Sequence, residues 1–536
     1  IYGKETYPDA TFTLRLTYGD VRSYGANGTL MQPFTTLAGL YDRVPYASYP
    51  FDVAHPAHLQ TVAVLLGVPA PDFRAARVLE IGCASGGHII PLAARNPGAI
   101  VVGVDISPVQ IELGRRRIER LGLGNIRLAC ASFADPGAID GPGATEEKFD
   151  YAIAHGVLSW IAPSLVEPLF RTIAAALAPG GIAYVSYSTH PGRSLHAALA
   201  QFVKNHARRF GGGQTGLDQA RALVRLLHEH AESSSHESDT GALRAEAGRI
   251  LADPDYALLH DHIEQERVFM FAEVAEMAAS AGLSYLSDAN WMSGLAENMP
   301  PASLPFAADA RNREAREQLF DFLAIRRYRA SLFGRAGGPP ADDTVPPERV
   351  RSLYVATELI GEQPLADGFF QYDTGKGQTV RVSDRRGIEA LRILMAAGRR
   401  PMPVEELVDA VIATLDAGTP VPRAPIVKLV RDLAVGGLAE LTLAPPAWTN
   451  EVSARPLADA VARDDTAGPP PYWATSHRHT PVQMLEPRAF LLSRCDGTRS
   501  ADDLVRDFDA AFPEGGGARA VRENLAWLAA HALLIG

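Results

Sequence analysis

Short apolar segments alternate with helical patterns between residues 77 and 188, and this alternation restricts the possible fold more than any other feature. The apolar segments are RVLEIG (77–82), AIVVGVD (99–105), NIRLACASF (125–133), FDYAIAHG (149–156) and IAYVSYS (182–188). One intervening helix, SPVQIELGRRRIERLG (107–122), begins with an N-cap serine followed by proline at its first position. Apolar strands that alternate with helices form a parallel sheet covered on both faces. The pattern predicts a doubly wound α/β fold.

Two later segments, LSYLSDA (283–289) and RSLYVATEL (351–359), are predicted to supply the sixth and seventh strands of the same sheet. The long helical pattern after His190 would then be an insertion within this domain. Residues 314–333 are predicted to form a further helix of that region. Beyond residue 370 the chain is expected to form a separate α-rich C-terminal domain, in which 383–411 reads as two helices joined by a short turn.

The resulting organisation has four parts. We predict a β-rich N-terminal segment (1–43), a cofactor-binding core (44–193), a helical region that contributes the last strands of the seven-stranded sheet (194–360) and the C-terminal domain (370–536). A chain of 536 residues is long enough for about three domains.

Composition narrows the class of protein. Apolar residues make up 47% and charged residues 21%, which is ordinary for a globular protein. The net charge of −11 disfavours binding to nucleic-acid backbones or anionic membranes. No apolar run is long enough for a transmembrane helix, and no signal peptide is visible. Three scattered cysteines suit a reducing compartment rather than a disulfide framework or a metal site. We therefore expect a cytoplasmic location.

The turn after the first strand, VLEIGCASGG (78–87), carries the strongest functional signal. Gly82 and Gly86 let backbone N–H groups approach a ligand closely. The pattern Glu-x-Gly-x-Ala-x-Gly, led by Glu80, differs from the dinucleotide fingerprint and resembles motif I of class I methyltransferases. A carboxylate repels a pyrophosphate but suits the cationic methionine end of S-adenosylmethionine (SAM). Glu80 therefore favours SAM as the cofactor.

Other residues complete the predicted cofactor site. Asp105 closes the second strand, where an acidic side chain accepts hydrogen bonds from ribose hydroxyls, although NAD enzymes share this device. Ser132 and Phe133 follow the third strand and suit adenine. The full predicted set is Tyr46, Tyr49, Glu80, Gly82, Cys83, Ala84, Gly86, Asp105, Ile106, Gln110, Ser132, Phe133, His155 and Gly156.

Longer motifs resemble a bacterial family of protein-lysine methyltransferases that modify outer-membrane proteins. The matching segments of the core are 77–93, 149–162 and 181–192. Segments 256–289 and 317–329 resemble the family's methyltransferase regulatory domain, and 476–484 and 494–504 resemble its C-terminal domain. The resemblance covers about 44–536. It implies a SAM-dependent methyltransferase that acts on lysine side chains of a protein substrate, such as an outer-membrane protein, and that forms a homodimer.

This chain departs from the family at a few positions. Ser188 stands where Asn is usual, His190 and Arg193 replace aromatic residues, and His88 often corresponds to Asn. The changes after the fifth strand lie beside the expected substrate channel, so they bear on the substrate rather than on the cofactor.

The methyl acceptor is expected at the carboxyl ends of the fourth and fifth strands, where open α/β sheets form their sites. Methyl transfer requires an unprotonated nucleophile held in line with the sulfonium, and a free lysine amine has a pKa of about 10.4. Burial or a nearby base must therefore assist. We predict His155, Tyr187 and Ser188 as catalytic residues, and Trp160, Tyr187 and His190 as substrate contacts. A purely structural role is the alternative for His155, Tyr187, Tyr46 and Tyr49.

Several alternatives stay open. The protein could methylate small molecules or natural products, or it could be a non-catalytic SAM-binding regulator. LHEHAESSSHESD (227–239) reads as a solvated helix end rather than a metal site, and no metal is expected. The pair at 383–411 reads as a protein-contact domain rather than a winged-helix DNA reader. No Asn/Asp-Pro-Pro-aromatic motif follows the fourth strand, which argues against nucleic-acid bases as acceptors.

Residues 1–43 show a different resemblance. DATFTLRLTYGDVRSYGANG (9–28) and PFTTLAGLYDR (33–43) resemble part of a periplasmic dipeptidyl-peptidase family of serine peptidases. The segment contains no histidine and no serine in a glycine-rich nucleophile setting, so it cannot carry a peptidase triad. We interpret it as a fusion or a gene-boundary artefact.

Overall fold

The structure is a computed structural model that describes residues 24–26, 29–31, 47–135, 137, 139, 148–210, 214–233, 237–254, 258, 266–309, 313–374, 379–415, 421–468 and 470–536. In the N-terminal segment, β1 (Tyr24–Ala26) and β2 (Thr29–Met31) pair as a short antiparallel hairpin. The remainder of 1–43 lies outside the described residues.

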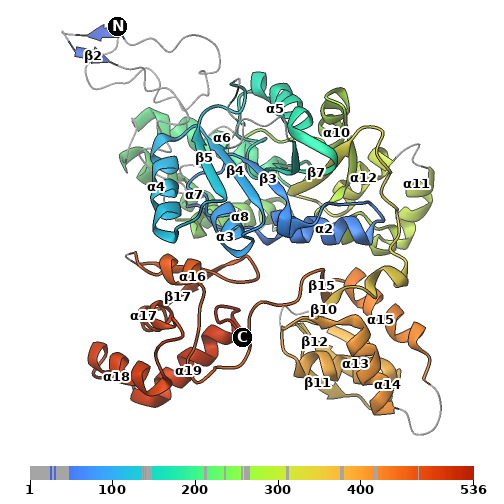
Figure 1. The fold of residues 1–536 in the computed structure, drawn as a ribbon. Coiled ribbons are helices and arrows are strands. Elements are labelled where there is room, and N and C mark those ends of the chain that lie inside the picture. The colour runs from blue at the N-terminus through green and yellow to red at the C-terminus, as the bar shows by residue number, and fades with distance from the viewer. Residues whose placement is uncertain are drawn as a thin grey trace.

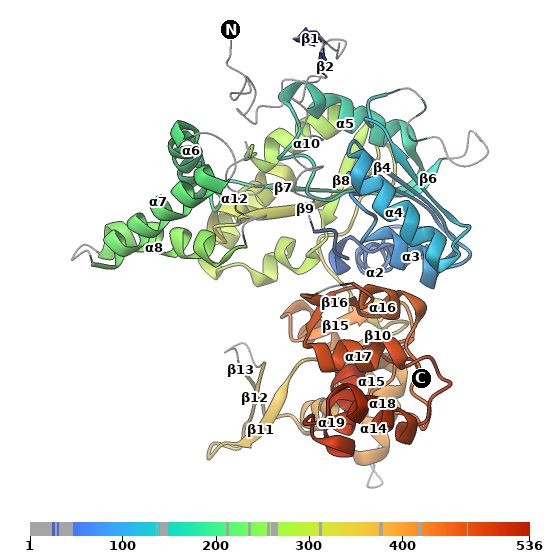
Figure 2. The same cartoon turned by 90° about the vertical axis from the view of Figure 1, so that its left-hand side faces the viewer.

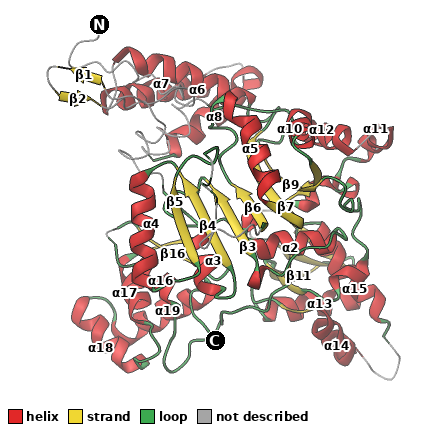
Figure 3. Ribbon diagram, turned by 45° about the horizontal axis from the view of Figure 1, so that its top comes forward, coloured by secondary structure: helices red, strands yellow, loops and turns green. Residues whose placement is uncertain are grey.

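A seven-stranded sheet forms the centre of the molecule (Figures 1 and 3). Its strand order is β5-β4-β3-β6-β7-β9-β8. The strands are β3 (Arg77–Ile81), β4 (Ile100–Asp105), β5 (Ile126–Cys130), β6 (Phe149–Ala154), β7 (Leu177–Ser188), β8 (Leu283–Asp288) and β9 (Tyr328–Arg335). Neighbours from β5 to β7 pair in parallel, whereas β9 is antiparallel to both β7 and β8. The doubly wound fold and six of the predicted strands are confirmed.

The prediction of the seventh strand is wrong. Segment 351–359 contains β10 (Tyr354–Thr357), which pairs with β14 (Met402–Pro403) and β15 (Ala439–Thr442) in a separate small sheet. The seventh strand is β9, which the sequence pattern placed in a helix over 314–333. The helix there, α12 (Arg313–Leu323), stops five residues earlier than β9 begins. Because all six inner residues of β9 are buried, the strand lacks the alternation that marks a half-exposed strand.

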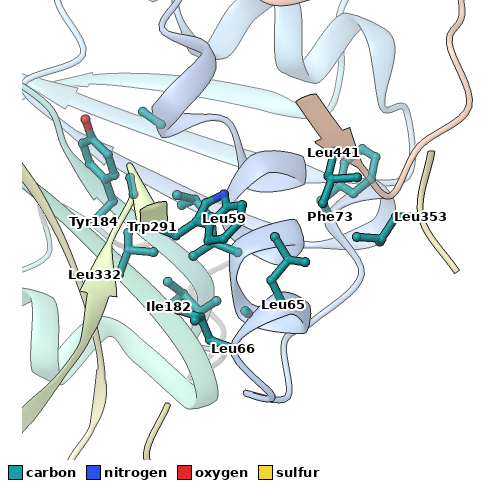
Figure 4. Close-up of a cluster of buried hydrophobic side chains, with 14 of the residues drawn as sticks. Leu59, Leu65, Leu66, Phe73, Ile182, Tyr184, Trp291, Leu332, Leu353 and Leu441 are labelled. Carbon is teal, nitrogen blue, oxygen red and sulfur yellow. The ribbon is translucent and has the colours of Figure 1, made fainter. Parts of the chain in front are cut away.

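Helices cover both faces of the sheet. On one face lie α2 (Pro56–Leu65), α3 (Ile89–Arg95) and α4 (Pro108–Leu121); on the other lie α5 (Pro163–Ala176) and α10 (Phe271–Ser280). Helix α2 packs in one apolar cluster with Ile182 and Tyr184 of β7 and with Leu441 of β15 (Figure 4). The same core therefore joins the sheet to the C-terminal region.

The predicted helical insertion is present after β7. It consists of α6 (Ser194–Ala207), α7 (Gln214–Ser233) and α8 (Glu237–Ala252), which project from the sheet with an apolar core of their own (Figure 2). Buried charges attach it to the sheet: His196 Nδ1 lies 2.6 Å from Glu246 Oε1, and Arg327 makes two 2.7 Å contacts with the same carboxylate.

The C-terminal region contains small sheets as well as helices, so it is less α-rich than expected. Its first unit, orange in Figure 1, holds β10, β11 (Ile360–Pro364), β12 (Phe370–Asp373), β13 (Thr379–Val382), α13 (Arg385–Ala396), β14, α14 (Val404–Leu415), α15 (Arg423–Val435) and β15. Its second unit, red in Figure 1, holds α16 (Ala460–Asp465), β16 (Tyr472–Thr475), β17 (Pro481–Met484), α17 (Glu486–Arg494), α18 (Ala501–Ala511) and α19 (Gly517–Ala530). Among the described helices, none has the length and apolar character to cross a membrane.

Candidate active site

The turn after β3 exposes bare backbone to a ligand. Gly82, Ala84 and Gly86 have φ values of +75°, +47° and +78°, so the chain turns sharply twice within five residues. A Cβ at Gly82 would lie 2.6 Å from Val157 Cγ2, so a side chain there would displace Val157 as well as strain the backbone. Ala84 is a non-glycine residue in the left-handed region, a form of strain that concentrates at functional sites.

Glu80, on the strand that leads into this turn, is a buried carboxyl with one oxygen unpaired within the described part of the chain. Its side chain is buried, and its Oε2 atom has no hydrogen-bond partner among the residues that the structure describes. Burial, and then the nearby charge of Asp105, raises the pKa of the Glu80 carboxyl to about 8. A buried carboxylate oxygen without a partner is unfavourable. The methionine ammonium of SAM is a cation of the right kind for it, so the site fits this cofactor.

Asp105 is held in a fixed orientation at the end of β4. Its Oδ2 accepts the Ala84 N–H at 2.9 Å, and its Oδ1 accepts the Ser107 N–H at 2.9 Å. Each carboxylate oxygen can accept more than one hydrogen bond. The side chain is therefore oriented to receive two vicinal hydroxyls, as a ribose offers.

The other predicted cofactor residues near Glu80 and Asp105 differ in burial and in orientation. Cys83 points into the core, where burial raises the pKa of its thiol, so only its backbone faces the turn. Ile106 is exposed beside Asp105, and Gln110 is buried in the first turn of α4. Ser132 Oγ accepts the Ala134 N–H at 3.2 Å, whereas Phe133 packs into an apolar cluster.

His155 stands at the acceptor side of the site, directly after β6. Its Nδ1 atom lies 2.9 Å from the Tyr184 hydroxyl, and its ring stacks on Phe51 with centroids 3.7 Å apart. Burial lowers the pKa of His155 to about 4. The imidazole is therefore neutral at physiological pH, and it acts as a hydrogen-bonding group rather than as a protonated general acid.

Strands β7 and β9 bring further hydroxyl groups next to His155. Ser186 Oγ accepts the Gly156 N–H at 2.8 Å and also accepts the Tyr328 hydroxyl proton. Tyr328 belongs to β9 and is partly exposed. Gly156 has φ +64°, and a Cβ there would meet no heavy atom of the described chain within 4 Å. The open side of Gly156 leaves room for a substrate group beside these hydroxyls.

Tyr187 and Ser188, both predicted as catalytic, lie on opposite faces of β7. Tyr187 is fully buried, with its hydroxyl 3.0 Å from Ser331 Oγ, in the apolar cluster beneath α5 and α10. Ser188 shares the face of Tyr184 and Ser186, and its hydroxyl donates to Glu266. Successive side chains of a strand alternate in direction. That rule could have identified Tyr184 and Ser186 from the sequence, whereas nothing local pointed to Tyr328 or Glu266.

The remaining predicted substrate contacts lie at the edge of the site. His190 Nδ1 is 2.7 Å from Ser194 Oγ at the start of α6. Trp160 is half-buried in the turn that follows β6. Neither makes a described contact with His155 or Tyr184.

The segment before α2 runs across the glycine turn. Ser48 Oγ accepts the Gly87 N–H at 2.8 Å, and the Phe51 N–H donates to His88 Nδ1 at 3.2 Å. A Cβ at Gly87 would lie 2.1 Å from the Ser48 carbonyl oxygen, so the two backbones touch. Tyr49 lies in this segment, as expected for a cover over the cofactor. Tyr46, the other predicted tyrosine, lies outside the described residues.

Comparison with known proteins agrees with this site. Residues 79–183 match the family model of a methyltransferase domain, and residues 254–335 match that of a predicted methyltransferase regulatory domain. Residues 1–63 match peptidase S46, in line with the resemblance of the N-terminal segment. The structure of PKMT2 from Rickettsia typhi in complex with AdoHcy has a TM-score of 0.81, with 21% identity, and covers 92% of this chain and 100% of that chain. The fold and the site thus define a SAM-dependent methyltransferase domain, and SAM is the cofactor this domain implies.

Two sequence relatives come from Rickettsia prowazekii (strain Madrid E). RP028 is 31% identical over 223 residues, which are 42% of this chain and 86% of that protein. RP789 is 34% identical over 328 residues, which are 61% of this chain but 58% of that protein. The chain belongs to the family of RP028. In this chain a methyltransferase domain is joined to a methyltransferase regulatory domain.

Proposed function

We propose that this protein transfers the methyl group of SAM to lysine side chains of a protein substrate. The observation that carries the proposal is the face formed by His155, Tyr184 and Tyr328 beside the open position at Gly156. This face lies at the carboxyl ends of β6 and β7; β3, which carries Glu80, adjoins β6, and β4, which carries Asp105, lies beyond β3. The likeness to PKMT2 supports a polypeptide acceptor.

SAM, when bound, supplies an electrophilic methyl group on a sulfonium. Glu80 would hold its ammonium, and Asp105 its ribose. On the acceptor side, the Tyr184 hydroxyl and the neutral His155 ring orient the attacking amine through hydrogen bonds. Burial beside His155 penalises the ammonium form of the lysine and so favours the neutral amine. The released proton reaches solvent along the Ser186 and Tyr328 hydroxyls, since Tyr328 extends to the surface.

The finer features of this proposal come from the family resemblance. An outer-membrane protein as the acceptor, a homodimer and a cytoplasmic location remain predictions.

The test is mass spectrometry of host proteins treated with the full chain and SAM. We expect methyl-mass increments on lysines, and their loss with Glu80→Gln but not with Glu112→Gln, an exposed glutamate on α4. Label that enters metabolites and no polypeptide would contradict the proposal.

Methylation of a small molecule is the second candidate. The trans-aconitate 2-methyltransferase of Methylobacterium radiotolerans (strain ATCC 27329 / DSM 1819 / JCM 2831 / NBRC 15690 / NCIMB 10815 / 0-1) is 31% identical over 123 residues, which are 23% of this chain and 41% of that enzyme. An untargeted metabolite screen with labelled SAM distinguishes the two. A non-catalytic regulator would bind SAM in calorimetry and methylate nothing in either assay.

A further inference from the structure

The segment that crosses the glycine turn is held from its outer side by the C-terminal region. We name residues 48–55 the cofactor strap, and residues 456–536 the C-terminal unit. Tyr49 of the strap packs on Trp473 of β16, with ring centroids 5.1 Å apart. His55, at the end of the strap, makes an edge contact with His479, with centroids 4.5 Å apart. Both contacts join residues more than 400 positions apart in the chain.

His479 also reaches the cofactor turn itself. Its Nε2 atom lies 2.9 Å from Nδ1 of His88, the residue that directly follows Gly86 and Gly87 and caps α3. The same His88 nitrogen accepts the Phe51 N–H of the strap. His88 and His479 are both buried, and burial lowers the pKa of each, so the pair is uncharged at neutral pH. One side chain of the C-terminal unit thus touches the strap and the turn together.

The loop that presents His479 is closed by its own hydrogen bonds and is bonded to helix α3. His479 adopts φ +61°, and hydrogen bonds from the Ser476 N–H to the Thr480 carbonyl and from the His479 N–H to the Ser476 carbonyl close the loop. Arg95, at the end of α3, donates to Asp459 at 2.8 Å and to the carbonyls of Ser476 and Thr475 at 2.5 and 2.7 Å. The C-terminal unit is therefore bonded to α3, the helix that directly follows the glycine turn.

We propose that the C-terminal unit completes the cofactor site, with Trp473 and His479 as positioning residues that hold the cofactor strap over the glycine turn. The strap in turn supplies Phe51, which stacks on His155. The inference rests on the proposed function in one respect, that the ligand of the turn is SAM or its product. It goes beyond that function because it assigns part of the cofactor affinity to a region outside the methyltransferase domain.

The test is calorimetry with S-adenosylhomocysteine and no acceptor, on the full chain. Trp473→Ala should weaken binding about fivefold, since aromatic pairs contribute about 1 kcal/mol beyond the area they bury. Trp473→Phe should retain most of the affinity. The matched control is Trp527→Ala in the same unit, where a half-buried Trp stacks on His531 and Arg488 away from the strap. It should leave the affinity unchanged.

A second measurement separates positioning from general stability. Hydrogen exchange of the ligand-free protein should speed up in residues 48–55 with Trp473→Ala, while α18 and α19 keep their protection. In turnover, KM for SAM should rise and KM for the acceptor should not. Wild-type affinity in Trp473→Ala, or an equal loss in Trp527→Ala, would overturn the proposal. If Trp473→Ala does not fold, Trp473→Leu decides by the same criteria.

The two proposals fail separately. If no acceptor is ever methylated but Trp473→Ala still weakens S-adenosylhomocysteine binding, the strap inference holds and the proposed function falls.

Discussion

The cofactor half and the acceptor half of the sheet are built in different ways. The cofactor half, β3 to β5, uses residues close together in sequence and relies on backbone: a glycine turn and the N–H groups of Ala84 and Ser107. The acceptor half, β7 to β9, collects side chains from distant segments and stabilises them with buried charges. The cofactor half is therefore encoded by residues that are close together in the sequence. The acceptor half is assembled only when distant segments meet in the folded protein.

Arg329 illustrates the construction of the acceptor half. It is fully buried in β9, with Nε 2.8 Å from Asp321 Oδ2 and Nη2 2.9 Å from Glu317 Oε2. Its guanidinium also lies over the Phe271 ring at 4.0 Å. These contacts join β9 to α12 and α10 and hold the strand that bears Tyr328.

Removing Arg329 should therefore have the largest effect. Arg329→Ala removes the buried cation that contacts Glu317 and leaves Asp321 with Arg326 alone, so we expect a loss of about 3–5 kcal/mol in the free energy of unfolding. Urea denaturation measures it. The control is Arg392→Ala on α13, an exposed arginine whose partners Glu362 and Glu389 are partly exposed, and it should change stability by about 1 kcal/mol or less. Similar losses in both variants would mean that β9 does not depend on buried charge.

The next effect concerns catalysis. Tyr184→Phe removes the hydroxyl that contacts His155, so kcat should fall roughly a hundredfold in a steady-state methylation assay. Tyr187→Phe is the matched control, because this tyrosine is equally buried in the same strand and its hydroxyl contacts Ser331 on the opposite face of the sheet. Each hydrogen bond lost should cost about 1 kcal/mol of stability. Equal losses of kcat in both variants would contradict the assignment of Tyr184 to the acceptor side.

Glu80 tests the cofactor half. Glu80→Gln preserves shape but removes the charge expected to hold the ammonium, so affinity for S-adenosylhomocysteine should fall about ten- to hundredfold in calorimetry. Glu112→Gln on the outside of α4 should leave it unchanged. Undiminished binding in Glu80→Gln would show that this carboxylate does not face the ligand.

The smallest expected effect is the pH dependence of that binding. The raised pKa of about 8 leaves the Glu80 carboxyl mostly protonated in the free protein at pH 7. A bound ammonium favours the ionised form, so binding releases a proton. Affinity should fall as the pH drops below about 8 and the Glu80 carboxyl takes up its proton, by at most the loss seen in Glu80→Gln. Calorimetry in two buffers of different ionisation enthalpy measures the released proton, and Glu80→Gln should abolish it.

The sequence predicted the two halves unequally. The glycine turn, Glu80 and Asp105 were found because backbone turns and strand ends leave local signals in residue type. Strand β9 was missed because a strand buried on both faces loses its alternating pattern, and basic residues such as Arg329 mimic a helical surface. Tyr187 and Ser188 were predicted together, although neighbouring side chains of a strand point to opposite faces, and Tyr184 lies on the face of Ser188. Trp473 and His479 reach the cofactor turn from the far end of the chain, and no local pattern encodes such a contact.

The position of β9 between β7 and β8 affects how the protein is made. Strand β7 leaves the ribosome long before its hydrogen-bonding neighbour at residues 328–335 has been synthesised. At translation rates of about 5–20 residues per second, its outer edge stays unpaired on the order of ten seconds or longer. An unpaired apolar edge invites association with other nascent chains. The helices of 194–252, which form a core of their own, emerge during that interval and are the first partners available to shield it.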